Sequence, residues 1–159
     1  MRPLRQGELA SNLEIEIAGY RALLDLLRAE QDALRSADAE ALPQLSRAKL
    51  RQVNALQEFA LARSRLLRAA SLPETAAGMS SLLSCGSEPE HAAALWRTLL
   101  QLAKGARNLN ALNGRLALVQ QCHFDRAISA LLQAAGHLGI YGADGRRQHA
   151  ASPRALAAI

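Results

Sequence analysis

Aromatic residues are scarce in this chain: phenylalanine, tyrosine and tryptophan together make up 3% of the 159 residues. A β-sandwich or barrel draws on aromatic and β-branched residues for its strands, so this composition argues against both. Half of the residues are nevertheless apolar. The apolar positions are therefore filled largely by leucine and alanine, and this favours an all-α fold.

Cysteine is also rare. The two cysteines, Cys85 and Cys122, form no CxxC pair and no disulfide framework. We therefore expect both of them to be small buried hydrophobic residues.

Long apolar runs are absent, since no stretch approaches the roughly 20 residues that a membrane-spanning helix needs. The first residues, "MRPLRQGELASN", have no apolar core of the signal-peptide kind. We expect a cytoplasmic, reduced protein that does not insert into a membrane. The sequence also has no glycine-rich phosphate loop and no HExxH motif, and its histidines are scattered. It therefore predicts no enzyme, no cofactor and no metal site.

Apolar residues recur at steps of three and four over most of the chain, the spacing of amphipathic helices. We expect helices over about residues 8–36, 42–70, 73–84 and 88–138. The first two form an elongated antiparallel hairpin, because their connection is short. Capping-box patterns at 71–74 and 87–90 would open the last two helices. Together the four form one helical domain over residues 1–145, and residues 146–159 are expected to be a disordered tail.

Charge is divided between the two helices of the hairpin. Acids outnumber bases in the first, and bases outnumber acids in the second. Exposed ion pairs contribute only about 0.2–1 kcal/mol each, but an acidic helix beside a basic one favours one orientation. The basic helix is therefore expected to face the acidic helix.

The last helix is too long for the hairpin. About 50 residues span roughly 75 Å, whereas each hairpin helix spans only about 42 Å. Some 20 residues, by this estimate, must extend past the hairpin or fold back at a kink. The second half of this helix is apolar on one face, through Phe124, Ile128, Leu131, Leu132, Ala135 and Leu138. Such a face predicts a partner-binding surface; the alternatives are a dimer seam, or burial under the short helix and the tail.

Helix-disfavouring residues interrupt the middle of the last helix, in "NLNALNGRLALVQQ" (residues 108–121). Asn110 and Asn113 are three apart and share a neighbouring face, whereas Gly114 permits a bend or a close backbone approach. A buried polar latch beside a close helix crossing accounts for this pattern.

Two short motifs in the last third of the chain resemble those of a known protein family. "LNALNGRL" (109–116), followed by "IYGADGR" (140–146), resembles the FlgN family of flagellar type III export chaperones. The resemblance implies a chaperone of hook-filament junction proteins. It would bind their apolar C-terminal helical region, prevent premature assembly and escort them to the export gate.

The family's substrate-binding region lies in the C-terminal half. The resemblance therefore places the substrate on residues 124–138, with Leu116 and Val119 as the upstream edge. It implies that Tyr141, in the YGxDG-like motif, docks to the cytosolic domain of the export gate.

Two other interpretations remain open. A structural coiled-coil homodimer or adaptor would pair through the 124–138 face. A basic nucleic-acid-binding protein would agree with the isoelectric point of about 10.0, but aromatic platforms are few and the cations lie beside an acidic helix. We therefore expect no nucleic-acid partner. An affinity that falls steeply with salt concentration would identify nucleic-acid binding, whereas binding of an apolar helix tolerates salt.

Overall fold

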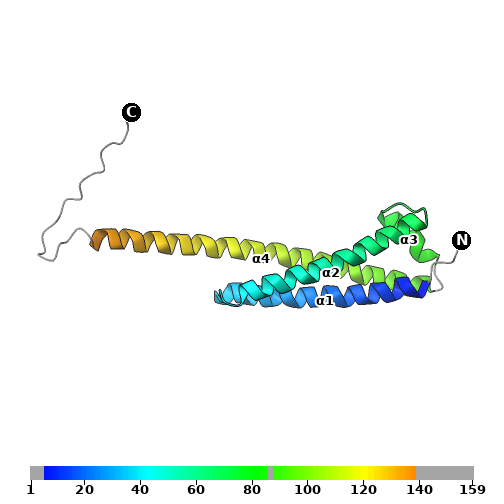
Figure 1. Cartoon of the computed structure of the whole chain (residues 1–159), viewed down its shortest axis with the longest axis horizontal. Coiled ribbons are helices and arrows are strands. Elements are labelled where there is room, and N and C mark those ends of the chain that lie inside the picture. Colours follow the sequence, from blue (N-terminus) through cyan, green and yellow to red (C-terminus); the bar gives the residue numbers. More distant parts are fainter. Residues whose placement is uncertain (1–5, 86–87, 139–159) are drawn as a thin grey trace, which may run out of the picture. The chain divides into compact units, whose positions relative to one another are not determined.

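The structure is a computed structural model that describes residues 6–85 and 88–138. Its four helices are α1 (Gln6–Ser36), α2 (Leu42–Ala69), α3 (Ala76–Ser84) and α4 (Pro89–Leu138) (Figure 1). The described residues contain no strand, which confirms the expected all-α fold. Tyr141, Ser87 and the expected tail at 146–159 lie outside the described residues.

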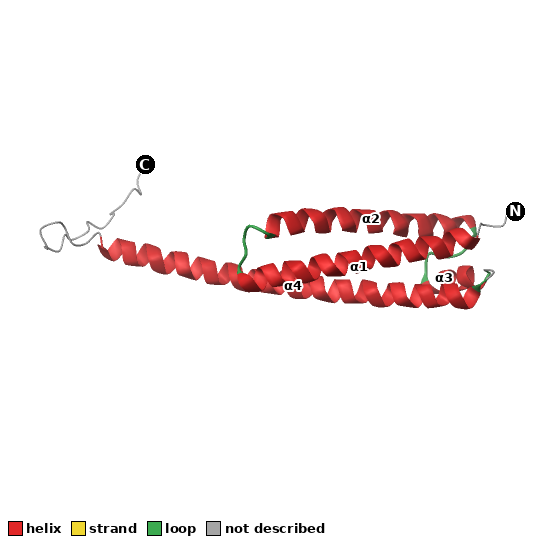
Figure 2. Cartoon of the chain, turned by 90° about the horizontal axis from the view of Figure 1, so that it is seen from below, coloured by secondary structure: helices red, strands yellow, loops and turns green. Residues whose placement is uncertain are grey.

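The chain divides into two units, residues 1–117 and 118–159. The expectation of a single domain over residues 1–145 stays a prediction. In the first unit, α1 and α2 run side by side in opposite directions (Figure 2). The ion pairs show this order, because Glu16 pairs with Arg63 whereas Glu30, later in α1, pairs with Lys49, earlier in α2.

The ends of α1 and α2 have the same backbone geometry. Ala37, directly after α1, and Ser71, two residues after the end of α2, have φ of 55° and 56°. After α2, the Ser71 N–H bonds to the Arg68 oxygen at 3.0 Å and the Leu72 N–H bonds to the Leu67 oxygen at 2.9 Å. This is the Schellman pattern, which satisfies carbonyl groups that a helix end leaves free.

The start of α3 differs from expectation. Thr75, and not Ser71, is the N-cap of this helix, and its hydroxyl oxygen accepts a 3.3 Å hydrogen bond from the Gly78 N–H. The capping-box prediction at residues 71–74 is wrong because Ser71 is used in ending α2. The helix therefore begins at Ala76, three residues later than expected.

Two apolar clusters hold the first unit together. One joins α1, α2, α3 and α4 through residues such as Leu13, Leu67, Met79 and Leu99. The other joins α1, α2 and α4 and contains Leu23, Leu27, Leu56 and Ala106. The apolar side chains of α3, such as Met79 and Leu83, are thus buried in the first cluster.

Candidate protein-binding site

The odd asparagines of α4 form a polar latch in the first unit. Asn113 is buried, and its amide nitrogen donates to the Leu27 main-chain oxygen at 2.8 Å and to Glu30 Oε2 at 2.9 Å. Lys49 of α2 binds the other oxygen of Glu30 at 2.5 Å and approaches Asn110 Oδ1 at 3.5 Å. One buried carboxylate therefore links α1, α2 and α4, which agrees with the predicted latch.

A second polar link lies near the other end of the bundle. Glu16, only 2% exposed, forms an ion pair with Arg63, whose guanidinium carbon lies 5.3 Å from the centre of the Trp96 ring. Burial raises the pKa of Glu16, and the hydrogen bond and charge of Arg63 oppose this rise. Burial and the nearby Glu16 charge also raise the pKa of Tyr20, against the opposing charges of Arg63 and Arg107.

These two links confirm that the acidic first helix faces the basic second helix. The sequence contained the charges but not the partners. The antiparallel arrangement could have predicted these partners, because it places residues early in α1 beside residues late in α2.

The glycine of the latch segment has no packing role. A Cβ built on Gly114 would meet nothing within 4 Å, and α4 continues as a helix through this position. The predicted close approach at Gly114 is therefore wrong. Close approach occurs instead at Gly19, where a Cβ would lie 3.0 Å from Leu56 Cδ2, and at Gly78, where it would lie 2.0 Å from the Pro73 oxygen.

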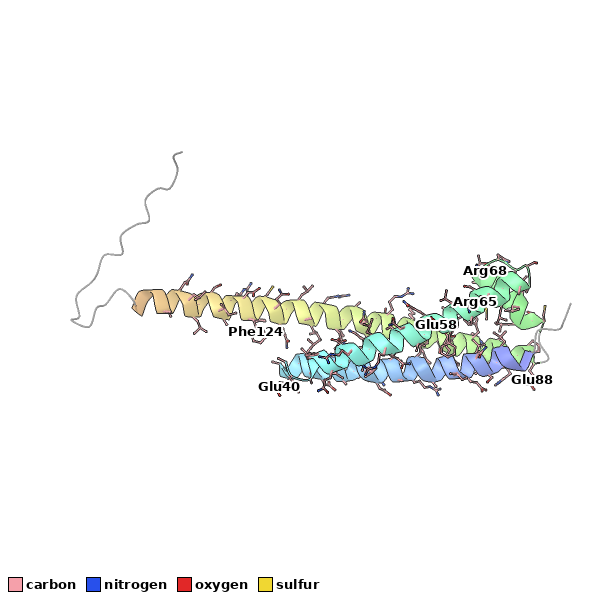
Figure 3. All side chains as sticks on the ribbon, viewed as in Figure 1. Glu40, Glu58, Arg65, Arg68, Glu88 and Phe124 are labelled. Carbon is pink, nitrogen blue, oxygen red and sulfur yellow. The ribbon has the colours of Figure 1, made fainter. Side chains whose placement is uncertain are left out.

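Large apolar side chains are exposed in the second unit. Phe124 and Ile128 are 56% and 55% exposed, and Leu131 and Leu132 are 69% and 68% exposed. Figure 3 shows the Phe124 side chain projecting from α4. All the side chains from 121 to 135 are exposed.

Five of the predicted site residues share one side of α4, because a helix turns about 100° per residue. We name them the Phe124–Ala135 face. They are Phe124, Ile128, Leu131, Leu132 and Ala135.

The other predicted site residues are not on this face. Val119, 54% exposed, is nine positions before Ile128, or about 180° around the helix, so it lies on the opposite side. Leu116 is partly buried in the first unit. Leu138 ends α4, but its side chain lies outside the described residues, as does all of Tyr141.

The cysteines were predicted wrongly. Cys85 and Cys122 are both exposed. Cys122 lies between residues 121 and 135 of α4, where every side chain is exposed. Small size and hydrophobicity alone were therefore not sufficient to bury it.

Comparison with known proteins bears on what such a surface does. The chain matches the family described as FlgN protein over residues 1–149. The chain belongs to the FlgN family. No curated protein and no solved structure matches it.

FlgN proteins are associated with flagellar export chaperone function and are not known as enzymes. Over the described residues of this FlgN protein, none of the helices combines the length and the hydrophobicity that a membrane crossing requires. The same residues contain no group of three or more histidine, cysteine or acidic side chains placed to hold a metal ion.

Proposed function

We propose that this FlgN protein is a cytosolic chaperone of hook-filament junction proteins. It binds their C-terminal amphipathic helical region on the Phe124–Ala135 face, prevents premature assembly and delivers them to the flagellar type III export gate. Tyr141 docks to the cytosolic domain of that gate.

The observation that carries this proposal is the exposure of four large apolar side chains on one helix face. A soluble chain gains free energy by burying such residues, and a face of this kind is typical of protein-binding surfaces. Leu131 and Leu132, more than two-thirds exposed, are its most accessible leucines. An amphipathic client helix would cover them and lose the surface that it needs for assembly.

The expected affinity is moderate. Burying the four large side chains contributes roughly 1.5–3 kcal/mol each, about 10 kcal/mol in total before other terms. Ordering of the client segment costs several kcal/mol of this. A dissociation constant in the micromolar to high nanomolar range follows, which suits later release at the gate.

Calorimetric titration of the full chain with the C-terminal helical segment of a junction protein tests the proposal. We expect one-to-one binding that persists at high salt, because apolar burial is little screened. The Leu131→Ala, Leu132→Ala double variant should lose it. Absence of binding, together with a tight homodimer in light scattering, would identify the face as an assembly seam and overturn the chaperone proposal. An affinity that falls steeply as the salt concentration rises would contradict client binding through apolar contacts.

A further inference from the structure

The Phe124–Ala135 face is wide for a site that takes one helix. Leu131 and Leu132 are sequence neighbours, so their directions differ by about 100° around α4. The seam between two paired helices is narrower than this, whereas a helix that packs against a multi-helix core has an apolar stripe at least this wide. The width alone favours an occupant with more than one helix.

In the first unit, residues of α4 that point in the same direction from the helix axis as the Phe124–Ala135 face are covered by other helices. Positions eighteen residues apart (106 and 124, 110 and 128, 113 and 131) are separated by five turns and have the same direction from the helix axis. Leu131 thus corresponds in phase to Asn113, which contacts Leu27 and Glu30 of α1.

The other edge corresponds to positions that contact α2. Ile128 matches Asn110, which lies 3.5 Å from Lys49. Leu132 is 36 positions, or ten turns, after Trp96, which Arg63 covers. Within the first unit, therefore, α1 contacts one edge of the corresponding side of α4 and α2 contacts the other edge.

We infer that the client occupies the Phe124–Ala135 face as a pair of packed helices from one molecule. One helix covers the Leu131 side and the other covers the Ile128 and Leu132 side, as α1 and α2 do in the first unit. This inference rests on the proposed function, and it replaces a single client helix with a two-helix element.

Photo-cross-linking from the two edges of the face tests it in the full chain. Asp125 and Ala127 are both exposed, flank the apolar residues and differ by about 160° around α4. Each is replaced, one at a time, by p-benzoylphenylalanine, and the full-length junction protein is the probe. Val119 carries the same group as a control on the opposite side of the helix.

We expect the products from positions 125 and 127 to map to two different helical segments of the client, in a one-to-one complex. Cross-links from both positions to one helical segment would overturn the inference and leave the proposed function intact. The same segment of two client copies, found in a one-to-two complex, would also overturn it. If the full-length client does not bind at all, the proposed function fails as well.

Discussion

Asn113 in α4 donates a 2.8 Å hydrogen bond to the main-chain oxygen of Leu27 in α1, and both lie at the core of the first unit. The main-chain oxygen of a helix residue normally receives only its own helix hydrogen bond. A side chain that adds a second one fixes both the distance and the register between α1 and α4.

Replacing Asn113 by alanine should lower the free energy of unfolding of the first unit by about 1–3 kcal/mol, because the buried Glu30 carboxylate loses a donor. Asn110→Ala is the matched control. Asn110 is exposed and its contact with Lys49 is 3.5 Å long, so its loss should cost less than about 0.5 kcal/mol. Urea unfolding followed by the fluorescence of Trp96, the single tryptophan of the chain, measures both. Equal losses in the two variants would contradict the role of the latch.

The stability of the first unit should depend on pH through Glu16. Burial raises its pKa in the folded state above the usual 4.5, so between these two values the folded chain binds more protons than the unfolded chain. The contribution of Glu16 to stability therefore falls as the pH rises through this window.

Glu16→Gln removes this titration. The free energy of unfolding of the native chain, minus that of the variant, should decrease as the pH is raised from about 4.5 towards neutrality. Urea titrations at a series of pH values provide the difference. A difference that increases with pH would show that Arg63 outweighs burial and that the pKa is lowered.

Replacing glycine by alanine should have opposite effects on stability at Gly114 and at Gly78. Gly114→Ala should stabilise α4 by up to about 1 kcal/mol, because its Cβ meets nothing and alanine is the better helix former. Gly78→Ala should destabilise the first unit by about 1–3 kcal/mol, since the new Cβ would lie 2.0 Å from the Pro73 oxygen. Thermal unfolding by circular dichroism compares the two. A destabilised Gly114→Ala chain would show that the open space around this residue is needed by the fold.

Glycine should also help where the backbone is left-handed. Ala37 and Ser71 have φ of 55° and 56°, a region that costs a residue with a Cβ about 1–2 kcal/mol. Ala37→Gly and Ser71→Gly should each raise the free energy of unfolding by up to about 1 kcal/mol, because greater freedom in the unfolded chain offsets part of the gain. Urea midpoints measure this, and a lower midpoint in both variants would contradict it.

The client site offers a matched pair of variants. Ile128 and Val119 are both β-branched and are 55% and 54% exposed, but they lie on opposite sides of α4. Ile128→Ala should weaken client binding about tenfold, whereas Val119→Ala should leave it unchanged. Calorimetry measures both, and equal losses would show that the client also covers the Val119 side.

Tyr141→Ala separates client binding from docking. We expect unchanged client affinity and weaker binding to the isolated cytosolic domain of the export gate. A loss of client affinity equal to that of Ile128→Ala would contradict the division between the two surfaces.

Much of the architecture could be read from the sequence. The all-α fold, the antiparallel hairpin and the long last helix follow from the three- and four-residue spacing of leucine and alanine, because helical periodicity is local. The charge division between α1 and α2 also predicted their pairing, and "LNALNGRL" with "IYGADGR" indicated the FlgN family.

Tertiary structure decided which residue does what. Ser71 matches a capping box in sequence, yet its left-handed backbone closes the C-terminus of α2, and Thr75 caps α3 instead. Gly114 and Gly19 look alike in sequence, but only Gly19 has a neighbouring helix against it. Asn113 became a buried donor and Asn110 an exposed contact because burial depends on the elements packed around a position. Local sequence determines which helices form; the distances between helices determine which side chains are buried, which are paired and which stay open to a partner.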